Sequence, residues 1–149
     1  MTASTMQAQR TAQTLGFAGL IPFYGALLAF AVFEDYPRSL AIQGFLMYSL
    51  AILCFLAGAL WGYARCRPAR EQSQRLLVSN GIVLFAVASM LTAQFALAAF
   101  LLMLGYLALL WFERNVDGSH SWYARMRWQL TLGVVVAHGL YIALHSAGA

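Results

Sequence analysis

The stretch LLVSNGIVLFAVASMLTAQFALAAFLLMLGYLALLWF, residues 76–112, decides the fold of this chain. As one helix its 37 residues would be about 55 Å long at about 1.5 Å per residue, whereas about 20 residues already cross a bilayer. In the middle of this tract the polar residues are Ser89, Thr92 and Gln94. We therefore predict that the chain turns there, giving two separate spans at 76–92 and 95–112.

The composition extends this interpretation to the whole chain. Hydrophobic residues make up 62% of it and charged residues only 9%, against about 45–50% and about 25% in soluble domains. A soluble domain of this size could not cover its surface with polar groups. We predict one domain, an all-α integral membrane bundle of five transmembrane helices, with spans at 15–33, 40–64, 76–92, 95–112 and 129–146.

The placement of arginine favours five spans. With five, eight of the nine arginines share one side and Arg38 alone lies on the other; a single span over 76–112 would leave five against four. Because cytoplasmic loops beside spans collect arginine, we predict a cytoplasmic N-terminus and a periplasmic C-terminus. Contact with the anionic bilayer surface accounts for the net charge of +4, so we expect the lipid bilayer as a partner and no nucleic acid.

Aromatic and arginine side chains mark the cytoplasmic ends of the spans, where such residues contact lipid headgroups. The residues that we place at this interface are Trp61, Arg65, Trp122, Tyr123 and Arg127. We expect residues 65–75 to form a basic loop and 122–129 to lie along the interface before the fifth span.

Small residues recur on one face of the second span, at Cys54, Gly58 and Gly62. Such spacing lets a neighbouring helix approach closely. We favour packing against another helix of the same chain; a homodimer face and no special role remain the alternatives.

The first span contains Pro22, which we expect to kink it, because proline cannot donate a backbone hydrogen bond. An alternative is that residues 1–31 are a removed signal peptide, since Ala29-Phe30-Ala31 is similar to a cleavage site.

Three stretches resemble the signature segments of a family of small membrane proteins, the domain of unknown function 3429 family, which includes the mitochondrial transmembrane protein 69. They are LGFAGLIPFYGALLA (15–29), YSLAILCFLAGALWG (48–62) and WYARMRWQLT (122–131). The resemblance implies a multi-pass protein of a bacterial or mitochondrial inner membrane, here the bacterial inner membrane. It implies no established activity, cofactor or substrate. The chain departs from the family pattern in having Leu60 before Trp61, where the family often has a basic residue or histidine.

The predicted spans contain few groups that could perform chemistry. They contain no Asp, Glu, Lys or Arg, and Ser49 and Ser89 have no histidine at helical spacing, so we expect no catalytic residues and a protein that is not an enzyme. His138 and His145 would lie about 10 Å apart along one helix, too far to be the two axial ligands of one haem, and the third histidine, His120, is in a loop. We expect no cofactor and no metal, and a hydrogen bond from His138 across the bundle.

Two functions remain. The first is a non-enzymatic accessory or assembly component of a larger inner-membrane complex, or a homo-oligomer, suggested by the small-residue face and the lack of buried charge. The alternative is a binder or carrier of a small uncharged or lipid-like molecule inside the bundle. Its candidate polar contacts are Gln43, Asn80, His138 and Tyr141.

Overall fold

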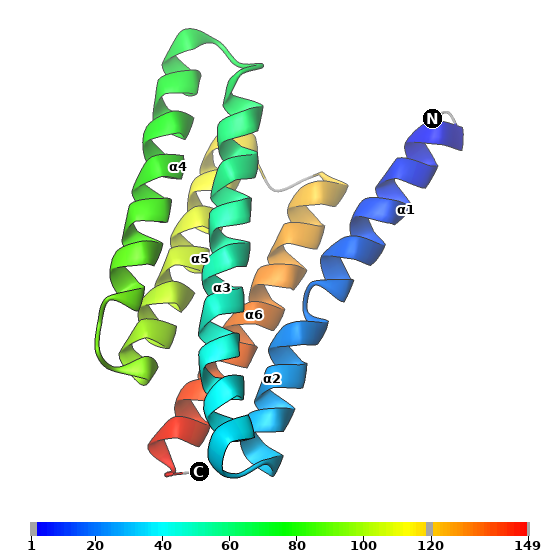
Figure 1. Cartoon of the computed structure of the whole chain (residues 1–149). Coiled ribbons are helices and arrows are strands. Elements are labelled where there is room, and N and C mark those ends of the chain that lie inside the picture. The colour runs from blue at the N-terminus through cyan, green and yellow to red at the C-terminus, as the bar shows by residue number, and fades with distance from the viewer. Residues whose placement is uncertain (1–2, 119–120, 149) are drawn as a thin grey trace.

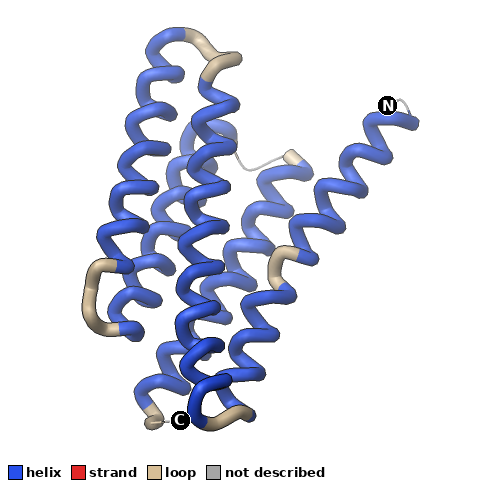
Figure 2. Tube along the Cα trace, viewed as in Figure 1, coloured by secondary structure: helices blue, strands red, loops and turns tan. Residues whose placement is uncertain are grey.

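A computed structural model describes residues 3–118 and 121–148 of the chain, and within these residues all regular structure is helical (Figures 1 and 2). The helices are α1 (Ala3–Ala18), α2 (Ile21–Val32), α3 (Asp35–Ala64), α4 (Ala69–Met90), α5 (Phe95–Asp117) and α6 (Trp122–Ser146). Five stretches of these described residues are long and apolar enough to cross a membrane: α1 and α2 together from Met6 to Val32, and each of α3, α4, α5 and α6. The prediction of an all-α chain with five such helices is confirmed.

The long apolar tract does fold back on itself. α4 ends at Met90 and α5 begins at Phe95, so the reversal uses residues 91–94. The hydroxyl of Ser89 donates to the Phe85 carbonyl at 2.7 Å, and that of Thr92 donates to the Ser89 carbonyl at 2.8 Å. Both hydroxyls are therefore satisfied by carbonyls of the last turns of α4, so neither is left without a partner where the chain reverses within the apolar tract.

The first span is broken at Gly19 and Leu20, just before Pro22. Pro22 has no N–H for the Ala18 carbonyl, so the helix bends, and the kink lies about one turn before the proline. At this break the hydroxyl of Tyr48 on α3 donates to the Gly19 carbonyl at 2.9 Å. α1 also begins at Ala3, well before the predicted start at residue 15.

Several helices run further than the predicted spans. α4 begins at Ala69, so the expected basic loop over 65–75 shortens to Arg65–Pro68, and Arg70 and Arg75 are helical. α6 is continuous from Trp122, and its cap is Ser121, whose side chain accepts a hydrogen bond from the Ala124 N–H at 3.0 Å. His120 lies outside the described residues.

α3 lies between α2 and α4 in the bundle, with α5 and α6 behind it (Figure 1). The α2–α3 connection and the C-terminus lie at one end, and the α3–α4 loop and the N-terminus at the other (Figure 2). The eight arginines that we predicted to share one side lie in α1, in the α3–α4 loop, at the start of α4, at the end of α5 and at the start of α6, near this second end. Arg38 is at the first end, 5.1 Å from the centre of the Phe30 ring.

The predicted seam of small residues does not form within the described part of the chain. Gly58 and Gly62 are exposed, and a Cβ at either position would meet open space. The buried face of α3 carries Leu53, Ala57, Leu60 and Ala64 instead. Gly58 follows Ala57 by one residue, and because successive helical residues point about 100° apart, Gly58 points away from this face. Ser79 of α4 donates to the Ala57 carbonyl at 2.6 Å across this face. Cys54 is half-buried at its edge.

The close approach between helices occurs instead at Gly105 of α5. A Cβ there would lie 2.7 Å from Cδ2 of Leu53, closer than side-chain atoms can pack. The absence of a side chain at Gly105 therefore lets α5 lie directly against α3.

Candidate functional site

Ser49 and His138 form a hydrogen bond in the centre of the bundle, 2.8 Å between Oγ and Nε2. The other ring nitrogen of His138 lies 2.8 Å from the Val134 carbonyl oxygen. A carbonyl can only accept, so Nδ1 carries the proton and the neutral ring accepts from Ser49 through Nε2. Tyr106 of α5 donates to the Ser49 carbonyl at 2.7 Å, which links α3, α5 and α6.

This pair resembles a nucleophile beside a base, an arrangement that helical spacing alone did not reveal because the two residues lie on different helices. Both side chains are completely buried. The His138 ring is enclosed by the rings of Phe23, Phe45 and Tyr106, with centroids 5.0–5.7 Å away. The arrangement leaves no room for a substrate beside Ser49, and both nitrogens of His138 already have partners. It therefore stabilises the packing of three helices.

The other polar candidates do not converge with His138 on one cavity. Tyr141 stacks on Phe45 at 4.5 Å between centroids and lies 3.4 Å from the Ile42 carbonyl. Gln43 and Asn80 are both exposed, and Asn80 donates to the Leu76 carbonyl of its own helix. The prediction that these four residues surround a ligand is not supported by this geometry.

An apolar cavity of about 480 Å³ lies instead between α1, α2, α3 and α6, within the range of about 300–1,000 Å³ typical of small-molecule sites. Leu15 and Phe55 line it and are exposed, so it opens on the side of the bundle. Its remaining lining comes from these four helices, from the break between α1 and α2, and from α5: Ala12, Gly16, Gly19, Leu20, Phe23, Ile52, Leu56, Ala59, Tyr106, Tyr123, Met126, Arg127, Leu130, Thr131 and Val134.

One polar group in the wall of the apolar cavity is unsatisfied. The hydroxyl of Thr131 is buried and has no hydrogen-bond partner among the described residues. A buried hydroxyl without a partner costs about 1–3 kcal/mol. Its oxygen is shielded from the cavity space, so it does not mark a contact for a ligand.

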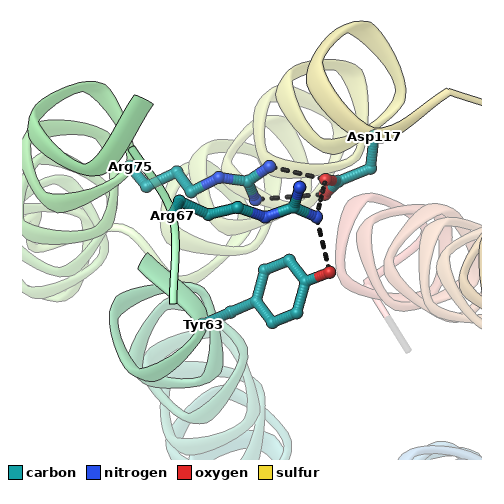
Figure 3. A network of polar contacts seen from close by, with 4 residues as sticks. All are labelled: Tyr63, Arg67, Arg75 and Asp117. Atoms are coloured by element: carbon teal, nitrogen blue, oxygen red, sulfur yellow. Dashed lines mark hydrogen bonds and ion pairs between the residues drawn. The ribbon is translucent and has the colours of Figure 1, made fainter. Parts of the chain in front are cut away.

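A second cavity, which we call the charged pocket, has a volume of about 590 Å³ and lies at the arginine-rich end. In it Tyr63 of α3, Arg67 of the α3–α4 loop and Arg75 of α4 meet Asp117 at the end of α5 (Figure 3). Arg75 binds both carboxylate oxygens of Asp117, at 2.5 and 3.1 Å. Arg67 lies 3.4 Å from the same carboxylate and donates to the Tyr63 hydroxyl at 2.6 Å.

The guanidinium groups of both arginines also face the Tyr63 ring, with Cζ atoms 4.7 Å from its centroid for Arg67 and 5.2 Å for Arg75. Such cation–π contacts fix a guanidinium group in place. Arg75 is fully buried, and its Nε has no partner among the described residues. Arg75 belongs to the stretch 65–75 that we predicted to be a loop, and for this residue the prediction is wrong: α4 begins at Ala69, and the Arg75 side chain is buried.

Arg127 is also buried, although we predicted it to lie at the interface. Its Nε and Nη2 both lie within 2.9 Å of one oxygen of Glu113, and the pairing explains how a charge can be buried there. Trp61, Arg65 and Tyr123 are exposed at this end and Trp122 is half-buried, as interfacial residues would be.

The two cavities adjoin each other. Ala59 and Tyr123 line both, while Arg127 lines the apolar cavity and its partner Glu113 lines the charged pocket. One signal in the sequence pointed to this place: Glu113 and Asp117 lie four residues apart at the end of a span, facing a cluster of arginines. Both lie between the predicted spans 95–112 and 129–146, whereas the structure includes them in α5.

Within the described residues, no cluster of three or more His, Cys, Asp or Glu side chains could hold a metal ion.

A family model described as protein of unknown function, DUF3429, matches residues 8–143. The chain belongs to the DUF3429 family. The matched region includes the three stretches on which the resemblance was based and all residues that line the two cavities. No curated protein and no solved structure matches the chain.

Proposed function

We propose that this DUF3429 protein is a multi-pass protein of the bacterial inner membrane that binds one lipid-like molecule in its apolar cavity. The observation that supports this most is the apolar cavity of about 480 Å³, which opens on the side of the bundle directly beside the charged pocket. An apolar chain would fill the cavity, and a polar group attached to it would lie at the charged pocket.

Bilayer acyl chains would enter any apolar cavity that opens toward lipid, so the volume alone does not support a specific ligand. What distinguishes this cavity from ordinary helix surface is the charged pocket beside it. Ala59 and Tyr123 line both cavities, so a polar group has a place next to the apolar cavity, at the depth of the headgroups.

We propose that the protein is not an enzyme. The paired Ser49 and His138 are enclosed by aromatic rings, and the carboxylates of Glu113 and Asp117 are bound by arginines. Catalysis needs an acid or base that can reach a substrate, and none of these groups faces the apolar cavity without a partner.

We also propose that the arginine-rich end faces the cytoplasm, with the N-terminus on that side and the C-terminus in the periplasm. The support is the gathering of eight arginines near one end, because positively charged loops remain in the cytoplasm.

The test uses the full chain purified in a mild nonionic detergent and weighed by native mass spectrometry. We expect a co-purifying lipid-like molecule at close to one per chain. Ala59→Phe places a ring where the two cavities meet, so most of the variant chains should be recovered without the bound molecule. The control is Ala51→Phe, at an exposed position of the same helix that lines neither cavity. Equal retention by both variants would count against the proposal.

A second candidate function is the accessory role in a larger membrane complex or homo-oligomer. It is favoured by the exposed face of α3 at Gly58 and Gly62, which no part of the described chain covers. Glycines on an exposed span allow another helix to approach closely. Affinity purification of the wild type and of Gly58→Leu from membranes tests it: a stoichiometric partner, or a second copy, should be recovered with the wild type and lost with the variant. Recovery of the wild-type chain alone would exclude it.

A further inference from the structure

The charge balance of the charged pocket indicates what kind of ligand would bind there. Three guanidinium groups, those of Arg67, Arg75 and Arg127, face two carboxylates, those of Asp117 and Glu113. Arg127 and Glu113 pair with each other, which leaves two arginines sharing one carboxylate. These five groups therefore have an excess of one positive charge. Glu71, four residues before Arg75 on α4, attracts Arg75 from a greater distance, but it does not line the pocket.

The environment makes this excess unfavourable without a further anion. Arg75 is buried, with its side chain 1% exposed, and Arg67 is only one third exposed. Charge that is removed from water needs pairing and full hydrogen bonding. Here Nε of Arg75 has no acceptor among the described residues, and Arg67 holds Asp117 through one nitrogen at 3.4 Å.

We infer that the charged pocket binds the anionic headgroup of an amphipathic lipid whose chain occupies the adjoining apolar cavity. The inference rests on the proposed function and adds the class of ligand to it. A phosphate or carboxylate group placed beside Arg67, whose side chain is one third exposed, would accept from its free guanidinium N–H groups. The same group would lie close to the buried charge of Arg75. Both guanidinium groups face the Tyr63 ring, and this contact holds them in place.

The position of Asp117 explains how the pocket stays stable when no lipid is bound. Its carboxylate binds the two terminal nitrogens of Arg75, and its side chain is 34% exposed. Asp117 therefore acts as an internal anion that competes with the headgroup for the two arginines. This contrasts with Glu113, which is 15% exposed and held by Arg127.

The two adjoining cavities fit an amphipathic molecule better than they fit a soluble anion. Ala59 and Tyr123 belong to both linings, so a headgroup at Arg67 and a chain in the apolar cavity would lie on either side of these two residues. The pocket also lies at the end of the bundle where Trp61 and Arg65 mark the level of the headgroups.

The experiment titrates the purified full chain in a nonionic detergent with phosphatidylglycerol and with phosphatidylcholine of the same acyl chains, and measures binding by native mass spectrometry. We expect phosphatidylglycerol to bind the wild type about tenfold more tightly, the scale of one charge-assisted hydrogen bond. Arg67→Gln should remove this preference. Arg70→Gln, which removes the same charge from an exposed position of α4 outside the pocket, should keep it.

Asp117→Asn gives a result that a purely structural role would not give. Removal of the competing carboxylate should weaken the fold without lipid, because Arg75 loses its partner. The same variant should bind phosphatidylglycerol about tenfold more tightly than the wild type does, with a larger rise in melting temperature on lipid addition. A drop in both stability and affinity would overturn the inference.

The remaining outcomes separate this inference from the function on which it rests. If the two lipids bind equally and Ala59→Phe weakens both, the apolar cavity binds a chain but the headgroup site is wrong. If neither lipid binds above background, both proposals fail. Inorganic phosphate serves as the probe for a soluble anion: stabilisation by phosphate alone, without any lipid preference, would overturn the lipid as the source of the anion.

Discussion

Replacement of Gly105 by alanine tests the packing of α5 against α3. The added Cβ would lie 2.7 Å from Cδ2 of Leu53 and 3.6 Å from the Phe85 ring. Leu53 is completely buried in the core, so its side chain has little space into which to move. Overpacking of this kind costs about 1–3 kcal/mol, and only part of it is offset by the preference of a helix for alanine over glycine, about 0.5–1 kcal/mol.

The matched variant is Gly58→Ala, which adds the same methyl group to an exposed position with nothing within 4 Å among the described residues. Only the helix preference acts there, so this variant should be unchanged or up to about 1 kcal/mol more stable. Gly105→Ala should be less stable than the wild type by about 1–2 kcal/mol. The two variants should therefore change the free energy of unfolding in opposite directions.

The measurement is unfolding of the purified chain in mixed micelles, with the fraction of denaturing detergent increased stepwise and helicity followed by circular dichroism. A transition midpoint that moves in opposite directions for the two variants agrees with the structure. If Gly105→Ala is as stable as Gly58→Ala, the Leu53 side chain moves aside and the overpacking argument is wrong. If Gly58→Ala is the destabilised variant, α3 packs through its glycine face instead.

Three further predictions concern the core, the cavity and the N-terminus. Ser49→Ala leaves Nε2 of His138 buried without a donor, so this variant should lose about 1–3 kcal/mol of unfolding free energy. The double variant Ser49→Ala with His138→Phe should regain most of that stability. Strictly additive losses would show that the two residues are not coupled. Thr131→Val removes a hydroxyl that has no partner in the described chain, so the empty protein should be up to about 1–3 kcal/mol more stable, while loss of stability would indicate a partner. Because α2 contributes Phe23 and Phe30 to the core, intact mass measurement should find the N-terminal residues retained, and a start near residue 32 would contradict this.

The order of the spans was predictable because hydrophobic blocks and arginine positions act over many residues at once. The reversal at Thr92 is an example: a tract that is too long for one crossing, with polar residues only at its middle, leaves little choice. The outcome for single residues was different. Gly58 and Ala57 differ by one position, and hydropathy does not indicate which of two small residues faces the next helix.

The charged pocket was harder to predict for a different reason. Arg75 follows a run of polar residues that is typical of a loop, yet α4 begins at Ala69 and carries them as its first turns. Burial of Arg75 depends on Asp117, which is 42 residues away and on another helix. Likewise the pairing of Ser49 with His138 spans 89 residues. Contacts of this range follow from the packing of the bundle, which local patterns do not specify.

The bond from Tyr48 to the Gly19 carbonyl has a consequence for the width of the apolar cavity. α1 forms one wall of that cavity through Ala12, Leu15 and Gly16, and its direction relative to α2 is set at the break where Tyr48 binds. Tyr48 itself does not touch the cavity space. Substitution of Tyr48 would therefore change the angle between α1 and α2. The width of the cavity, and so the size of the molecule that can enter, would change although every lining side chain stays the same.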